Sequence, residues 1–131
     1  MSIMVAAGGI ILNNGKILLI ENFYGWGFPK GRLEKYETIK ETAVREIKEE
    51  TGLKEFEIVR ILGKITRPSK ERTGEIITKD IYLFLVKTNS MQLEPEEECK
   101  WVNADEVINE LYYKEDKVFL EKNLKLIKTF F

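Results

Sequence analysis

The sequence predicts a domain of the α/β class, in which β-strands alternate with two or three helices. Two aliphatic stretches at 3–12 and 16–21 flank an Asn-Asn-Gly turn, a combination typical of a β-hairpin. Residues 38–51 instead repeat apolar side chains at the spacing of an amphipathic helix. Apolar, strand-like stretches return at 57–66 and 75–87, so predicted strands lie on both sides of that helix in the chain.

The composition is that of one globular domain, which we expect to span residues 1–131. Hydrophobic residues make up 44% of the chain and charged residues 33%. The formal net charge of −1 gives no reason to expect an anionic membrane or nucleic acid as partner. No apolar run reaches transmembrane length. We expect a monomer or a homodimer.

Two further features point to the cytoplasm. Cys99 is the one cysteine, so it has no internal disulfide partner. The N-terminus lacks the basic region and the long apolar run of an export signal. Lys, Glu and Ile are abundant and Gln92 is the one glutamine, a bias found in hyperthermophile proteins and produced equally by an AT-rich genome.

The chain contains no histidine. This excludes serine–histidine and cysteine–histidine catalysis and any metal site built on imidazole. Carboxylates must therefore carry the acid–base chemistry of any enzymatic site.

The helix at 38–51 has clear start and stop signals. Thr38 and Glu41 have the spacing of a capping box, in which each side chain accepts a hydrogen bond from the other residue's backbone N–H. An apolar stripe follows, and Gly52 stands where a left-handed cap would end the helix.

Another face of this helix carries Glu46, Glu49 and Glu50, which are neighbours one turn apart. Like charges at this spacing destabilise a helix by roughly 0.2–0.5 kcal/mol per pair. A divalent cation such as Mg²⁺, which takes oxygen ligands and works with substrate phosphates, would relieve the repulsion. A solvated acidic face is the other interpretation of the spacing alone.

The longer segment 31–53 decides between these two interpretations. Gly31 is followed by five residues, Glu37, seven residues and then R-E-I-K-E-E-T-G-L at 45–53. This segment resembles the Nudix box, G-x5-E-x7-R-E-U-x-E-E-x-G-U with U aliphatic, at all nine defined positions. The resemblance implies a Nudix α/β/α sandwich, with a mixed sheet flanked by the box helix and the C-terminal helices. It also implies a pyrophosphohydrolase that uses Mg²⁺ or Mn²⁺.

The resemblance further implies roles for individual residues. Glu46, Glu49 and Glu50 would share metal binding and water activation, with the backbone carbonyl of Gly31 as a further ligand. Arg45 would orient a catalytic glutamate. The outlying glutamate of the box, at position 37, would have a supporting role. Some family members take a base from a glutamate beyond the box; the candidates lie at 96–98, and we take Glu98 forward as a catalytic candidate.

Substrate identity depends on residues outside the box. The segment W-G-F-P-K-G at 26–31 resembles the lead-in of diadenosine tetraphosphate hydrolases and of diphosphoinositol polyphosphate phosphatases. The first of these implies cleavage of diadenosine tetraphosphate to ATP and AMP. The alternatives are a nucleoside triphosphate or RNA 5′-end pyrophosphohydrolase, a diphosphoinositol polyphosphate phosphatase, or a Nudix-fold sensor that binds a nucleotide without cleaving it.

Four residues are candidate substrate contacts. Lys30 belongs to the lead-in segment, and Arg67 to a basic loop expected at 67–74. That loop is either a solvated hairpin tip or an electropositive lip over a polyphosphate. In the hydrolases that this chain resembles, aromatics from a late strand and from the segment before the last helix hold an adenine between them. Tyr82 and Tyr113 occupy the corresponding positions.

The remaining elements complete the prediction. Residues 75–87 alternate two apolar faces in their second half, which indicates a central strand covered on both sides. A short strand is expected at 99–102, a helix at 104–111 and a closing helix at 117–130.

Overall fold

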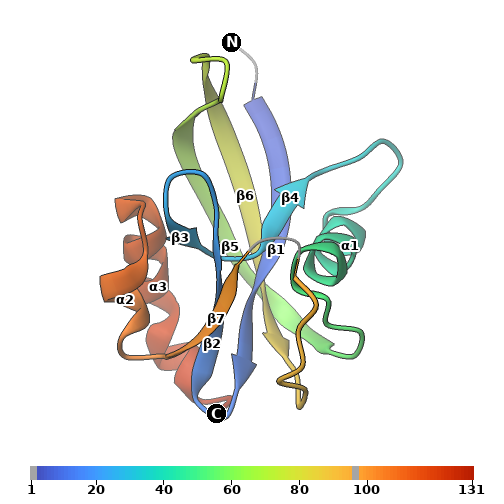
Figure 1. Cartoon of the computed structure of the whole chain (residues 1–131), viewed down its shortest axis with the longest axis vertical. Coiled ribbons are helices and arrows are strands. Elements are labelled where there is room, and N and C mark those ends of the chain that lie inside the picture. Colours follow the sequence, from blue (N-terminus) through green and yellow to red (C-terminus); the bar gives the residue numbers. More distant parts are fainter. Residues whose placement is uncertain (1–2, 96–97) are drawn as a thin grey trace.

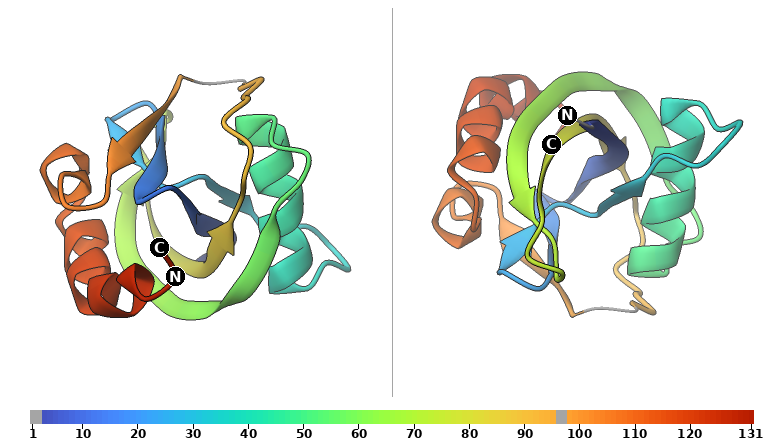
Figure 2. Two further views of the ribbon diagram at one scale, coloured as in Figure 1. Left: turned by 90° about the horizontal axis from the view of Figure 1, so that it is seen from below. Right: turned by 90° about the horizontal axis from the view of Figure 1, so that it is seen from above.

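The computed structural model describes residues 3–95 and 98–131. Within them, strands form one mixed seven-stranded sheet, in the order β3-β2-β1-β6-β5, with β4 added to β1 and β7 to β2. Helix α1 covers one side of this curved sheet, and α2 and α3 lie on the other (Figures 1 and 2). The predicted α/β/α sandwich is therefore confirmed. No helix in the described part of the chain is long and apolar enough to cross a membrane.

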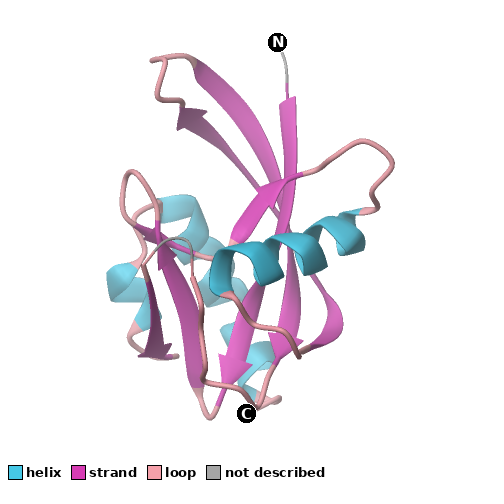
Figure 3. Cartoon of the chain, turned by 45° about the vertical axis from the view of Figure 1, so that its right-hand side comes forward, coloured by secondary structure: helices cyan, strands magenta, loops and turns pink. Residues whose placement is uncertain are grey.

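In the described part of the chain, four strands precede helix α1, three strands follow it, and α2 and α3 come last. Figure 3 distinguishes the helices from the strands by colour. Their bounds are β1 (Ile3–Asn13), β2 (Lys16–Glu21), β3 (Trp26–Gly27), β4 (Lys30–Arg32), α1 (Ile39–Thr51), β5 (Glu57–Lys70), β6 (Ile76–Lys87), β7 (Cys99–Asn103), α2 (Val107–Glu110) and α3 (Lys114–Lys128).

Strand β1 organises the sheet. It pairs in parallel with β6 along ten consecutive partners, from Ile3↔Thr78 to Leu12↔Lys87. Its other edge is divided, because β4 pairs with Ala6–Gly8 and β2 pairs further along. Strand β4 thus lies beside the first half of β1, next to α1, where the box glycine meets the box helix.

The core has two halves, one on each side of the sheet, and β6 contributes to both. Ile81, Leu83 and Leu85 pack with α2 and α3, whereas Phe84 and Val86 pack with α1. The predicted position of this strand, central and covered on both faces, is confirmed.

Three predicted boundaries are wrong. Strand β5 continues to Lys70, so Arg67 is a strand residue and not part of a loop. Pro68 is tolerated because β5 is an edge strand, where a missing N–H costs no internal hydrogen bond. The helix expected at 104–111 is one turn, Val107–Glu110, and the closing helix begins three residues early, at Lys114.

Candidate active site

Helix α1 begins and ends as its sequence predicts. Thr38 Oγ1 accepts from Glu41 N at 3.1 Å, and Glu41 Oε1 accepts from Thr38 N at 2.9 Å. At the other end Gly52 adopts a φ of 76°, and its N–H donates to Lys48 O. The acidic face therefore lies on a helix that is capped by hydrogen bonds at both ends.

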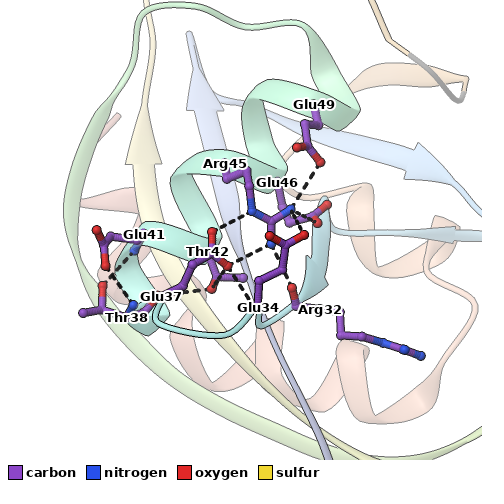
Figure 4. Close-up of polar contacts among 9 residues, drawn as sticks. All are labelled: Arg32, Glu34, Glu37, Thr38, Glu41, Thr42, Arg45, Glu46 and Glu49. Carbon is purple, nitrogen blue, oxygen red and sulfur yellow. Dashed lines mark hydrogen bonds and ion pairs between the residues drawn. The ribbon is translucent and has the colours of Figure 1, made fainter.

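Arg45 is the centre of a hydrogen-bonded carboxylate network (Figure 4). Its Nε donates to Glu37 Oε2 at 2.7 Å, and its Nη2 donates to Arg32 O at 2.9 Å. Its Nη1 donates to Glu46 Oε1 at 2.7 Å and to Glu49 Oε2 at 3.3 Å. One guanidinium thus ties α1 to β4 and fixes two of the three predicted metal-binding glutamates.

The contacts of this network shift the pKa values of its residues. Hydrogen bonds from Arg45, followed by one from Thr42, lower the pKa of Glu37 to about 2. The same contacts raise the pKa of Arg45 above its ordinary value. Burial raises the pKa of Glu46, and the Arg45 guanidinium opposes this change. Desolvation in the fold therefore disfavours the charged form of Glu46.

Gly31 lets β4 approach α1 closely. A Cβ added at this position would stand 1.9 Å from Cδ of Glu46 and 2.2 Å from its Oε2, so the Glu46 carboxylate occupies the space of the missing side chain. The neighbouring Lys30 donates its backbone N–H to Glu50 Oε1 at 2.7 Å. The carboxylates of Glu46 and Glu50 are both placed against β4 as a result.

The donor set suits a hard divalent cation in its chemistry. The carboxylates of Glu46, Glu49 and Glu50 face β4 or Arg45, and that of Glu46 lies in the space that a side chain at position 31 would fill. In the arrangement observed, these carboxylates accept hydrogen bonds from Arg45 and the Lys30 amide. Among residues 3–95 and 98–131, no three acidic side chains already converge as a ready-made metal cage.

A cavity of about 430 Å³ adjoins this acidic face at Lys30. Three of its lining cations come from three different strands: Lys30 from β4, Arg67 from β5 and Lys79 from β6. Burial, with a further effect of Arg67, lowers the pKa of Lys30 to about 8. The remaining lining residues come from the β2–β3 connection, the tip of the β5–β6 hairpin and the start of α3: Asn22, Phe23, Tyr24, Ser69, Lys70, Glu71, Arg72, Thr73 and Tyr113.

Arg67 is a buried residue of this cavity and not the solvated tip residue that one interpretation of the sequence allowed. Its Nε lies 3.2 Å from Oδ1 of Asp116, and the side chains of the two residues are 2% and 4% exposed. The Arg67 guanidinium also stacks on Tyr113, with its carbon 3.6 Å from the ring centroid. The folded chain therefore holds the positive charge of Arg67 in a fixed position at the cavity.

The structure does not bring the two predicted base contacts together. Tyr113 lines the cavity on the α3 side of the sheet, whereas Tyr82 packs with the half of the core that faces α1. Tyr82 and Ile81 are consecutive in a strand and so point to opposite faces. One adenine cannot be held between Tyr82 and Tyr113 in this arrangement.

Glu98 lies immediately before β7; its carbonyl accepts from Glu21 N at 2.8 Å and its side chain is exposed. Next to it, Cys99 Sγ lies 3.9 Å from the carbonyl oxygen of Glu50, so Glu98 lies near the C-terminal end of α1. The alternative bases at 96–97 lie outside the described residues.

Sequence reasoning missed Asp116, Lys79 and Tyr24 as parts of this site. Tyr24 closes the cavity wall, because its hydroxyl donates to Lys70 O at 2.8 Å across the hairpin tip. The sequence signal for Lys79 was weak, a single lysine before an apolar run. Asp116 gave none, because it lies among charged residues at the start of a polar helix.

The comparisons with known proteins agree with the geometry. The family model of the NUDIX domain matches residues 3–122. The 8-oxo-(d)GTP phosphatase of Mycolicibacterium smegmatis is 31% identical over 103 residues, which cover 76% of this chain and 30% of that protein. The ADP-ribose pyrophosphatase of Methanocaldococcus jannaschii is 42% identical over 79 residues, 56% of this chain and 46% of that protein. The chain spans less than half the length of these curated relatives.

Solved structures with the same fold include an Ap4A hydrolase from C. elegans in a binary complex. It has a TM-score of 0.77 and 23% identity, and the match covers 96% of this chain and 98% of that one. The dihydroneopterin triphosphate pyrophosphohydrolase of E. coli has a TM-score of 0.74 and 15% identity, covering 90% and 92%. At these identities the likeness concerns the fold. Because the family model spans residues 3–122, nearly the whole chain, this chain belongs to the Nudix family.

Proposed function

We propose that this protein is a metal-dependent pyrophosphohydrolase of nucleoside polyphosphates, with diadenosine tetraphosphate, cleaved to ATP and AMP, as its best substrate. The observation that carries the proposal is the junction at Lys30. Its backbone N–H binds Glu50 of the acidic helix, and the same residue lines the basic cavity. A phosphate chain held in the cavity would therefore lead to the carboxylates.

Hydrolysis needs a positioned water, a base and neutralised phosphate charge. A bound Mg²⁺ or Mn²⁺, held by Glu46, Glu49, Glu50 and the carbonyl of Gly31, would polarise a phosphoryl oxygen and acidify water. The water oxygen forms a bond to phosphorus, the bond from that phosphorus to the bridging oxygen breaks, and the electron pair leaves with the departing phosphate.

Carboxylates of this chain take up the proton that the water loses. We assign that role to Glu49 or Glu46, because Nη1 of Arg45 fixes both. Glu98, exposed immediately before β7, is the further candidate base. Lys30 and Arg67 would bind the phosphates that do not react, and the ring of Tyr113 would contact a base.

Several family substrates would use the same helix, and the cavity favours those with a long phosphate chain. The cavity is lined by one carboxylate, that of Glu71, and by five cations, which favour a tetraphosphate or triphosphate over a diphosphate compound: Lys30, Arg67, Lys70, Arg72 and Lys79. ADP-ribose and 8-oxo-dGTP are included in the test because two relatives of this chain are named for activity on such compounds. A nucleotide sensor needs no intact set of box glutamates, and all of them are present here.

A substrate panel in ¹⁸O-labelled water with Mg²⁺ tests the proposal. It should contain diadenosine tetraphosphate, 8-oxo-dGTP, ADP-ribose, a triphosphorylated RNA and a diphosphoinositol polyphosphate. We expect the highest kcat/KM for diadenosine tetraphosphate, with ATP and AMP as products and the label in one of them. Turnover of no compound would favour the sensor, and a hundredfold preference for another compound would replace the substrate.

A further inference from the structure

We propose that Asp116 is a positioning residue, which holds Arg67 in the cavity as a receptor for a phosphate group of the substrate. The inference deepens the proposed function and rests on it for the identity of the substrate. It assigns a role to a helix α3 residue that lies outside the Nudix box and whose hydrogen bond and ion pair, within residues 3–95 and 98–131, are with Arg67.

The geometry restrains the Arg67 guanidinium on two sides. Asp116 Oδ1 accepts from its Nε, and the ring of Tyr113 covers one face at 3.6 Å. Tyr113 and Asp116 belong to the same turn at the start of α3, so one short segment provides both restraints. Neither Nη of Arg67 donates a hydrogen bond to another residue in the described part of the chain, while Arg67 lines the cavity. The side of the guanidinium left for a ligand carries these two nitrogens.

The chemistry of this free edge selects phosphate. A guanidinium presents parallel N–H donors whose spacing fits two oxygens of one phosphate or carboxylate group. Lys30 and Lys79 line the same cavity and add positive charge. On the cavity rim Glu71 is already paired with Arg32 at 3.7 Å and with Lys79 at 3.8 Å. An anion with more than one charge is the ligand that this set of groups would attract.

Stability alone gives no reason for a buried ion pair at this place. The free energy lost when two charges are removed from water is about as large as the free energy gained from their attraction. A pair of apolar residues of similar volume often stabilises a fold equally well. Helix α3 is already held to the sheet by Phe119, Leu120 and Ile127 in the apolar core. Burial raises the pKa of Asp116 while Arg67 opposes this rise, as expected for a carboxylate kept in place by its partner.

The test measures binding of inorganic tripolyphosphate by calorimetry in EDTA, so neither a metal nor hydrolysis is involved. Asp116→Asn removes the charge that fixes Arg67, and we expect at least tenfold weaker binding, about 1.4 kcal/mol. Asp105→Asn is the matched control, because Asp105 pairs with Lys128 at the far end of the same helix. The control should bind as the wild type does.

If Asp116→Asn unfolds, the double variant Arg67→Met with Asp116→Leu allows binding to be measured on a folded protein that lacks the pair. It replaces the pair by apolar side chains of similar size, so it should fold and still lose tripolyphosphate binding by tenfold or more. In turnover, Asp116→Asn should raise KM tenfold and leave kcat within about twofold, whereas a purely structural role would change neither in the folded fraction.

Wild-type affinity for tripolyphosphate in folded Asp116→Asn would overturn the inference. Wild-type affinity in the folded double variant, or a wild type that binds none at millimolar concentration, would overturn it as well. Because this binding needs no cleavage, a protein that binds tripolyphosphate through Arg67 and Asp116 but cleaves no nucleotide would refute the proposed function alone.

Discussion

Arg45 shows how one side chain can prepare a catalytic surface. Its five N–H donors reach Glu37, Glu46, Glu49 and the carbonyl of Arg32, so the box residues are connected before any ligand arrives. Lysine could not replace it, because an ammonium lacks the planar fork that meets three carboxylates and a carbonyl at once. Glu37 accepts two of these bonds, which makes it a supporting residue of the network.

The depressed pKa of Glu37 predicts a measurable acid response. Its pKa of about 2 in the folded protein lies below the ordinary 4.5, so its contribution to stability is complete above pH 4.5. That contribution is lost as pH falls from about 4.5 to about 2. The free energy of unfolding of Glu37→Gln should therefore lie below that of the wild type at pH 6, and the difference should shrink toward pH 2. Denaturant unfolding across this range measures it, and a constant difference would contradict the assignment.

The opposite positions of Tyr113 and Tyr82 lead to a second prediction at this scale. Tyr113→Ala should raise KM for diadenosine tetraphosphate about tenfold with kcat little changed. The variant removes a stacking contact with a base, worth roughly 1–3 kcal/mol, and the ring that covers one face of Arg67. Tyr82→Ala serves as the comparison, with lower stability and a smaller change in KM, because its ring packs against the core next to α1. Equal changes in KM would show that both rings contact the substrate.

At the scale of elements, the site depends on how closely β4 lies against α1. A methyl group at position 31 would overlap the Glu46 carboxylate, whose side chain is flexible enough to move. Gly31→Ala should therefore fold normally but lose at least tenfold in kcat, because Glu46 is displaced. Gly27→Ala is the matched control in β3, where the nearest atom to an added Cβ lies 3.4 Å away. Circular dichroism and kcat measured on both variants separate misfolding from displacement, and a wild-type kcat for Gly31→Ala would count against a role of Glu46.

Local sequence signals explain which elements could be predicted. The sequence of helix α1 contains a capping box, an apolar face and a terminating glycine, and that of β6 alternates two apolar faces. Both elements can therefore be predicted from residues close together in the chain. The extension of β5 could not be predicted from neighbouring residues. Pro68 is tolerated in a strand only if one edge of that strand is free, and a buried Arg67 needs a carboxylate partner from elsewhere in the chain. That carboxylate, Asp116, is 49 residues away in sequence, and its burial is a property of the assembled fold.

At the scale of the whole molecule, the sheet separates two chemical environments that meet at one strand. Glutamates lie on α1 on one side, cations line a cavity on the other, and β4 joins them through Lys30 and Gly31. The division of the β1 edge between β4 and β2 is what brings this junction to the middle of the molecule. The box residues could be predicted from their pattern, whereas the cavity results from three strands and a helix that only the fold brings together.

The most direct test of the account is the kcat of Glu49→Gln, measured beside its free energy of unfolding in EDTA. Glu49 is half exposed and makes one long hydrogen bond to Arg45, so its charge contributes little to stability. We expect kcat for diadenosine tetraphosphate to fall by about 10²- to 10⁴-fold. The free energy of unfolding should stay unchanged or rise slightly, because a like-charge neighbour of Glu46 is removed. A kcat near that of the wild type, or parallel losses of activity and stability, would contradict the central claim that the acidic face of α1 carries the chemistry.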